Sequence, residues 1–244
     1  MTFVPDCLDP SRVSAESGSL LLLESLRLHP GGAAIDTEFA ARLSEPYDVY
    51  VNDAFGTAHR AHASVEAAAR LYAAGRKAAG FLMEREVAAL SRVVDQPEQP
   101  FVAVVGGAKV STKTAPLEAL TGRVRSLLIG GGMANTFFLA QGFEVGRSLV
   151  EEEMVETARA VLAAASERGI DLILPADVVV VDSIDEPQRL EVVASDAIPA
   201  DLMVVDIGPE ARARCREVLS AARTVFWNGP MGVFEVPDYA AGTL

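Results

Sequence analysis

Two of the chain's three lysines, Lys109 and Lys113, stand four residues apart directly after the glycine pair Gly106-Gly107. The apolar run Phe101–Val105 before the glycines has the length and β-branched content of a strand buried on both faces. If a helix begins near Ser111, the two ammonium groups lie near one another. Backbone N–H groups of a glycine turn and a helix start also attract anions. The stretch therefore predicts a phosphate site, with a solvated helix face beside an ordinary tight turn as the alternative.

A second apolar run, Val124–Ile129, also ends in glycines, Gly130-Gly131-Gly132. In a parallel sheet, both glycine turns would lie at the same carboxyl edge, where ligands of α/β proteins bind. Neither a GxxxxGK[ST] loop nor a GxGxxG fingerprint occurs, which argues against a P-loop protein and a Rossmann-type dehydrogenase. From spacing alone the interpretation ends at an anion site.

Other polar side chains follow apolar runs in the first half of the chain. Arg27 comes after Leu20–Leu23, and Arg60 lies within Asn52–His62, which also contains two of the three histidines. No cysteine or third histidine is near those two histidines in sequence, so we expect no zinc site there. For Asn52, Asp53 and His59 we expect hydrogen bonds within the loop. Either arginine is an ordinary surface residue or an anion ligand.

Composition limits the class of protein. At 244 residues and 50% hydrophobic, the chain can bury a sizeable core. Its formal charge of −13 argues against nucleic-acid and anionic-membrane partners. The two cysteines, Cys7 and Cys215, have no CxxC spacing and fit a reducing cytosol, each as a small core residue. No apolar run approaches the roughly 18 residues that span a bilayer, and no leader pattern is present, so we expect a cytoplasmic location.

Five motifs together resemble phosphoglycerate kinase, in the order of that family. They are VNDAFGTAHRAHAS at 51–64, GFLMERE at 80–86, GGAKVSTK at 106–113, IGGGMANTF at 129–137 and WNGPMGVFE at 227–235. The resemblance covers only the middle of a family member. The family's opening substrate loop and its closing glycine-rich aspartate loop, which serves magnesium and phosphate, are expected before Met1 and after Leu244.

The resemblance implies phosphoryl transfer between 1,3-bisphosphoglycerate and ADP with Mg²⁺, giving 3-phosphoglycerate and ATP in glycolysis. Lys109 would be the catalytic residue that meets the transferring group, and Arg27 and Arg60 would bind the phosphoglycerate. The nucleotide would be bound by Lys113, Gly130, Gly131, Gly132, Asn228, Gly229, Gly232 and Glu235, with Glu235 on the ribose. The family often has glycine where this chain has Val204, which would narrow the nucleotide pocket. Acidic residues usual after the family's LRFHP-like motif are here Gly32-Ala33-Ala34.

The expected fold class is α/β, with two Rossmann-like parallel-sheet domains joined by a helix, both incomplete. Residues 1–95 would be a partial substrate domain that ends in the interdomain helix at 79–94, and residues 96–244 a partial nucleotide-binding domain. Pro97 and Pro100 mark the boundary. Ser148–Glu151 reads as a capping box that starts a helix, and residues 182–200 read as a loop. Alternation of strands and helices predicts one doubly wound parallel sheet in the second domain.

Activity of this chain alone is expected to be low, because the resemblance places catalytic loops outside it. The sheets would have exposed edges and favour aggregation. A monomer is expected at full length. The alternative from another class is a non-catalytic nucleotide-binding module, which nucleotide titration with and without 3-phosphoglycerate would distinguish from a kinase.

Overall fold

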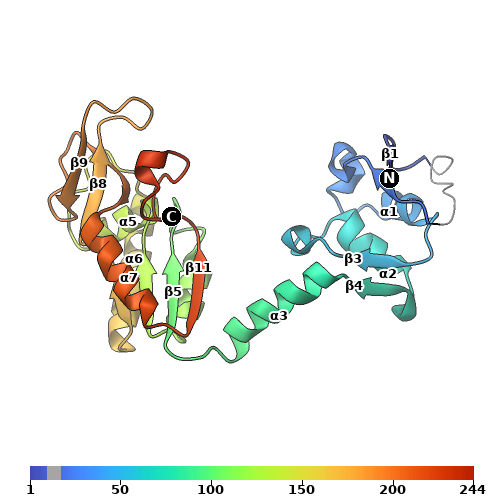
Figure 1. The fold of residues 1–244 in the computed structure, drawn as a ribbon, viewed down its shortest axis with the longest axis horizontal. Coiled ribbons are helices and arrows are strands. Elements are labelled where there is room, and N and C mark those ends of the chain that lie inside the picture. The colour runs from blue at the N-terminus through green and yellow to red at the C-terminus, as the bar shows by residue number, and fades with distance from the viewer. Residues whose placement is uncertain (10–17) are drawn as a thin grey trace. The chain divides into compact units, whose positions relative to one another are not determined.

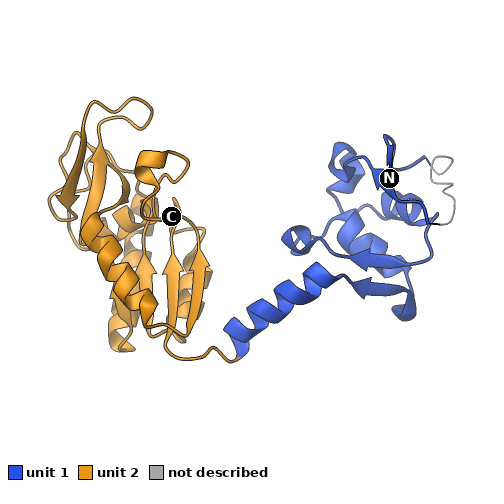
Figure 2. Cartoon of the chain, viewed as in Figure 1, with its two compact units in different colours: residues 1–95 blue, residues 96–244 orange. Residues whose placement is uncertain are grey.

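The computed structural model describes residues 1–9 and 18–244. It divides the chain into two compact units, residues 1–95 and residues 96–244 (Figures 1 and 2). The division falls directly before the segment that contains Pro97 and Pro100. Of the helices described, none combines the length and the apolar character needed to cross a membrane.

Four parallel strands form the main sheet of unit 2, in the order β11-β5-β6-β7. Figure 1 labels β5 and its neighbour β11. They are β5 (Phe101–Val105), β6 (Ser126–Ile129), β7 (Asp171–Ile173) and β11 (Thr224–Asn228). All five residues of β5 are buried, as the apolar run predicts. Val102 and Val104 pack with Ala211 of helix α7 (Pro209–Ser220), so this helix covers one face of the sheet. The parallel sheet predicted for this half of the chain is confirmed for these four strands.

Three further helices accompany the sheet: α4 (Thr114–Leu120), α5 (Gly132–Ala140) and α6 (Val155–Glu167). Seven residues of α5 are buried, including Phe137 and Phe138. The helix ends before Gly142, whose φ of 88° is the left-handed conformation expected just past a helix. Helix α7 begins with Pro209 at its first position, where proline costs no hydrogen bond within the helix.

A second sheet in unit 2 is antiparallel, which the sequence interpretation did not predict. Its strands, β8 (Asp177–Val181), β9 (Leu190–Ala194) and β10 (Met203–Ile207), lie in the order β10-β8-β9. The prediction that residues 182–200 form a loop is wrong, because β9 pairs with β8 along its whole length. The connection from β8 to β9 is too short for the crossover that a parallel pair needs, so the chain turns back as a hairpin.

Unit 1 contains two separate two-stranded parallel sheets. Strand β1 (Thr2–Val4) pairs with β2 (Leu21–Leu23), and β3 (Tyr50–Asn52) pairs with β4 (Lys77–Ala79). The helices are α1 (Thr37–Ser44), α2 (Ala68–Leu71) and α3 (Phe81–Asp95). Asp36 caps α1, since its Oδ1 accepts the N–H of Phe39 at 2.9 Å.

The core of unit 1 is small. It is a cluster of buried residues made of Cys7, Phe39, Ala40, Ala63, Ala67 and Ala68. Cys7 is 4% exposed, which confirms its predicted place in the core. Helix α3 has no buried residue, and its Phe81 is 88% exposed.

Candidate functional site

Three glycine turns meet at one edge of the main sheet of unit 2. They follow β5, β6 and β11, which are neighbours in the sheet, so their carboxyl ends lie together. Backbone hydrogen bonds join the turns: Gly106 N–H donates to the Asn228 carbonyl at 2.9 Å, and Gly107 N–H to the Pro230 carbonyl at 2.9 Å. Gly131 N–H donates to the Met231 carbonyl at 2.9 Å. The sequence prediction that the first two turns share an edge is confirmed, and the third turn joins them.

Glycine is required where these turns touch. Gly131 has a φ of 66°, and a Cβ built on it would lie 2.7 Å from the backbone nitrogen of Gly107. Gly229 has a φ of 93°, and its Cβ would lie 2.3 Å from the Gly106 carbonyl oxygen. Both positions combine a left-handed backbone with close backbone packing, so only glycine fits without a shift. These glycines are therefore needed for the turns to pack against one another.

A cavity of about 430 Å³ opens beside these turns. Four residues that the resemblance assigns to the nucleotide line it: Gly131, Gly132, Gly232 and Glu235. The other four, Lys113, Gly130, Asn228 and Gly229, do not line it, and a Cβ on Gly130 would meet the Met231 side chain at 2.3 Å. Most of the remaining lining is apolar, including Leu149, Ile184, Met203, Val204, Val205, Met231 and Val233. An apolar cavity of this size with a few polar groups is typical of sites for small organic molecules.

The two lysines lie in a loop and not on one helix face, which corrects the expected geometry. Helix α4 begins at Thr114, with Lys113 as its N-cap residue, and Lys109 lies in the loop before it. The Lys113 ammonium donates to the Asn228 side-chain oxygen across 115 residues of sequence. Its Cε lies 3.7 Å from the Cβ position built on Gly107, which lines the cavity. Lys109 is exposed.

Four backbone N–H groups of the turns already have partners and are not free for an anion, which corrects the expectation from the sequence. Those of Gly106, Gly107 and Gly131 are used between the turns, and that of Gly130 donates to the Val105 carbonyl at 3.1 Å. The positive charge for an anion therefore comes from side chains here.

Glu151 anchors the loop between the two lysines, a role that the sequence interpretation missed. Its carboxylate accepts the hydroxyl of Ser111 at 2.6 Å and the N–H of Ser111 at 3.0 Å. The predicted capping box is wrong, because Ser148 Oγ instead accepts the N–H of Val204 at 3.0 Å and helix α6 starts only at Val155. Ser148 and Glu151 match the capping-box pattern, but each forms its hydrogen bonds with a different segment of the chain.

The pKa of Glu151 reflects this environment. Burial opposes ionisation of the carboxyl group and raises the pKa, but the hydrogen bonds from Ser111, a further one from the Val110 backbone and the charge of Lys109 lower it. The net result is a pKa below the ordinary value. Glu151 is therefore held as a carboxylate that stabilises the lysine loop.

Asp206 is a second residue that the sequence interpretation missed. It lies in β10, lines the cavity and is 1% exposed. Its Oδ2 accepts the Gly242 N–H at 2.7 Å, whereas its Oδ1 has no hydrogen-bond partner among the described residues. Burial raises the pKa of this carboxyl group, although backbone hydrogen bonds from Gly242 and Ile207 and the charge of Arg212 oppose that shift. An acidic residue inside an apolar strand, beside a β-bulge between Val204 and Asp206, is the signal that could have identified it.

The two predicted phosphoglycerate ligands belong to unit 1. Arg27 lies in the turn Leu26–Leu28 that follows β2, and Arg60 follows β3 and donates from Nε to His59 Nε2 at 3.3 Å. Both are exposed, and neither forms an ion pair with another described residue. The loop hydrogen bonds expected of Asn52 and His59 are confirmed, since Asn52 Oδ1 accepts the Ala54 N–H at 3.0 Å. Asp53 instead reaches helix α3, where its Oδ1 accepts the Met83 N–H at 3.0 Å.

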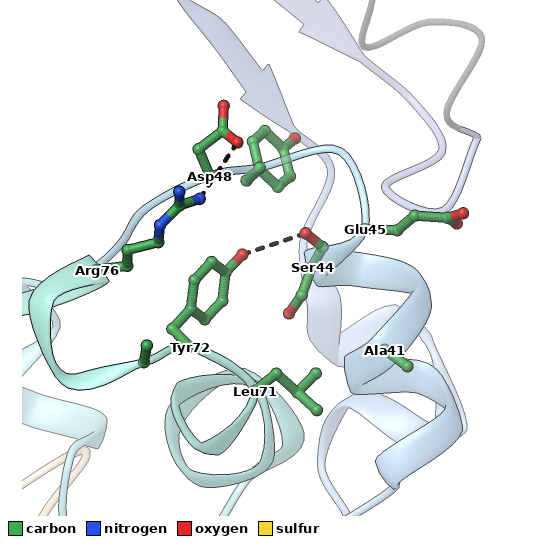
Figure 3. Close-up of a pocket in the computed structure, with 9 residues that line it drawn as sticks. Ala41, Ser44, Glu45, Asp48, Leu71, Tyr72 and Arg76 are labelled. Atoms are coloured by element: carbon green, nitrogen blue, oxygen red, sulfur yellow. Dashed lines mark hydrogen bonds and ion pairs between the residues drawn. The ribbon is translucent and has the colours of Figure 1, made fainter.

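Unit 1 also has a cavity of about 460 Å³ that contains none of the predicted site residues (Figure 3). Tyr72 points into it and donates its hydroxyl to the Ser44 carbonyl at 3.2 Å, while Arg76 pairs with Asp48 at 3.7 Å across the rim. These polar groups already have partners, so the hollow offers few free groups for recognition. The glycine-turn cavity of unit 2 is the stronger candidate.

Comparison with known proteins places this geometry in a family. The family model described as "Phosphoglycerate kinase" matches residues 1–244. A phosphoglycerate kinase of Thermomicrobium roseum (strain ATCC 27502 / DSM 5159 / P-2) is 53% identical over 228 residues, which are 93% of this chain and 57% of the relative. One of Cereibacter sphaeroides (strain ATCC 17025 / ATH 2.4.3) is 50% identical over 247 residues, 100% of this chain and 62% of the relative.

Solved structures agree. Phosphoglycerate kinase from Coxiella burnetii is similar with a TM-score of 0.83 and 40% identity, covering 100% of this chain and 61% of that one. The enzyme from Pyrococcus horikoshii OT3 gives a TM-score of 0.85 at 29% identity and 64% coverage of its chain. The predicted α/β, Rossmann-like fold class is thereby confirmed. The chain spans about three-fifths of the length of these relatives, and it belongs to the phosphoglycerate kinase family.

Proposed function

We propose that this chain forms part of a glycolytic phosphoglycerate kinase and contributes residues for both of its substrates. The reaction would be reversible phosphoryl transfer between 1,3-bisphosphoglycerate and ADP. The strongest support for this function is the cavity at the three glycine turns. Three segments that are far apart in sequence form this cavity at one edge of the sheet. Family membership supports a nucleotide as the ligand of that cavity.

Unit 2 would bind ADP or ATP. The apolar cavity suits a planar base, and the exposed carboxylate of Glu235 at its wall could accept hydrogen bonds from ribose hydroxyls. The Lys113 ammonium would weaken its hydrogen bond to Asn228 and contact the nucleotide phosphates. Val204 lines the cavity, so its side chain would narrow the space available to the base.

Unit 1 would bind 3-phosphoglycerate. Arg27 and Arg60 carry charges that no described acidic residue neutralises, and a guanidinium group donates two parallel hydrogen bonds to a phosphate or carboxylate. In a chain of net charge −13, such local positive charge is needed to attract an anionic substrate.

Mg²⁺ would enter with the nucleotide. Among the described residues, no group of three His, Cys, Asp or Glu side chains that could hold a metal ion lies beside the cavity, and Glu151 is committed to Ser111. The residues present do not form a protein-built magnesium site, which agrees with Mg²⁺ keeping nucleotide phosphates and water as its ligands.

Lys109 would stabilise the negative charge on the transferring phosphoryl group, since phosphoryl transfer depends on alignment and charge stabilisation and needs no covalent enzyme intermediate. In a chain extended to the length of the relatives, Lys109→Ala should lower turnover by about 10²–10³-fold, because losing one preorganised donor costs about 3–4 kcal/mol of barrier. A coupled spectrophotometric assay measures this. Near-normal turnover in the folded variant would refute the role.

The proposed partners are these small molecules alone, and we propose a cytoplasmic protein that is monomeric at full length. Calorimetric titration tests the function directly. A kinase should bind 3-phosphoglycerate, with affinity reduced by Arg27→Ala or Arg60→Ala and unchanged by Arg85→Ala on helix α3. Binding of ADP without any binding of 3-phosphoglycerate would favour the alternative of a simple nucleotide-binding module.

A further inference from the structure

Three chemically different metal ligands meet in unit 1, and none of them is a residue proposed to bind a substrate. Asp6, Cys7 and His29 each offer one ligand atom, and these atoms all lie within 4.8 Å of one another. Asp6 and Cys7 directly follow β1, and His29 follows the turn after β2. Because β1 and β2 are paired in parallel, with Val4 opposite Leu23, their carboxyl ends bring the two segments together.

The positions of these side chains are fixed by neighbours. Asp6 Oδ1 accepts the N–H of Leu8 at 2.9 Å, which orients the carboxylate, and no hydrogen bond joins its other oxygen to a described residue. The His29 ring packs on Phe39, with ring centroids 5.6 Å apart. His29 is held through its backbone as well, since its carbonyl accepts the Gly32 N–H at 2.9 Å. Partners of this kind are what orient the ligands in metal sites.

The donor set matches one metal better than others. A thiolate, an imidazole and a carboxylate are the three ligand types of zinc sites, with bonds of about 2.0–2.3 Å. In a tetrahedral site, bonds of this length place ligand atoms about 3.3–3.8 Å apart. Because the three ligand atoms lie within 4.8 Å of one another, each separation would have to close by at most about 1.5 Å to reach these values. A hard cation such as Mg²⁺ would not select a sulfur ligand.

We propose that Asp6, Cys7 and His29 form a site for Zn²⁺, with water in the fourth position. Cys7 is 4% exposed, His29 is half-buried and Asp6 is exposed, so the ion would approach from the side of Asp6 and His29 while the thiolate stays shielded. The two anionic ligands balance the charge of the ion.

The bond that forms is between zinc and the Cys7 sulfur, and the thiol proton leaves to solvent. Zinc binds the thiolate form of cysteine, so binding should release about one proton per ion.

Cobalt titration of the chain tests the proposal, because Co²⁺ replaces Zn²⁺ and reports its ligands by absorption. We expect a thiolate-to-cobalt charge-transfer band that saturates at one ion per chain and disappears when Zn²⁺ is added. Cys7→Ser should abolish the band, and His29→Ala should weaken Co²⁺ binding at least about 10-fold, since even the loss of a partner of a ligand costs that much. The matched controls, Cys215→Ser and His62→Ala, should leave the band unchanged.

The proposal is overturned if wild-type chain gives no thiolate band, or if the band persists in Cys7→Ser or vanishes in Cys215→Ser. If Cys7→Ser fails to fold, alkylation of the cysteines in the wild-type chain tests the proposal instead. Zn²⁺ is then expected to slow modification of Cys7 and not of Cys215, as followed by mass spectrometry of the peptides. Equal rates for Cys7 with and without Zn²⁺ would reject the site.

Discussion

Single residues decide whether the three glycine turns can pack together. Gly131→Ala places a Cβ 2.7 Å from the Gly107 backbone at a φ of 66°, so we expect it to destabilise the protein by about 1–3 kcal/mol and to weaken ADP binding. Gly142→Ala is the matched control, since Gly142 also has a positive φ, 88°, but no atom lies within 4 Å of its Cβ position. Urea denaturation measures both. Equal losses would show that backbone strain alone matters, and would contradict the packing argument.

At this scale the sequence predicted residue types better than residue partners. Lys113 was identified by its spacing after Gly106-Gly107, but its bond to Asn228 depends on β11 lying beside β5, which no local pattern reveals. Glu151 matched a capping box by chance of spacing, and its real partner, Ser111, lies 40 residues away. Side chains that bind distant segments are the ones that sequence patterns misassign.

At the scale of elements, the lysine loop depends on the Glu151 carboxylate. The pKa of Glu151 is lower in the folded chain than its ordinary value of 4.5, so its contribution to stability is present above that value and is lost as the pH falls through the folded pKa. Glu151→Gln should therefore be less stable than wild type at pH 7, with the difference shrinking below about pH 4.5.

Denaturation at several pH values measures this difference, and Glu153→Gln, an exposed neighbour, is the control. A stability difference between wild type and Glu151→Gln that stays constant from pH 7 to pH 4 would mean that the charge of Glu151 does not hold the loop.

Elements were predicted well where burial produces a clear pattern of apolar residues in the sequence. The fully buried strand β5 reads directly as an apolar run, and Asp36 marks the start of α1. Strand β9 was missed because only alternate residues are shielded and its neighbours in sequence are acidic. The orientation of β8 against β10 follows from tertiary pairing, which periodicity along one strand does not encode.

At the scale of the whole molecule, each unit has its own hydrophobic core, and we expect the two cores to differ in stability. The sheets of unit 1 have only two strands each, and such sheets are marginal alone. We expect calorimetry to show two unfolding transitions, the first from unit 1. ADP at 100 times its Kd should stabilise only the second, by about 2.7 kcal/mol. A shift of the first transition alone would contradict the assignment of the nucleotide to unit 2.

The central claim is that the glycine turns of unit 2 form a nucleotide site with Lys113 at the phosphates. Isothermal titration of the chain with ADP tests it most directly, beside Lys113→Ala and the control Lys77→Ala, which removes the lysine outside unit 2. We predict one ADP per wild-type chain, an affinity about 10–100-fold lower in Lys113→Ala, since a hydrogen bond to a charged group contributes about 1.5–3 kcal/mol, and no change in Lys77→Ala. Folded wild-type chain that binds no ADP, or equal affinities for wild type and Lys113→Ala, would contradict the account.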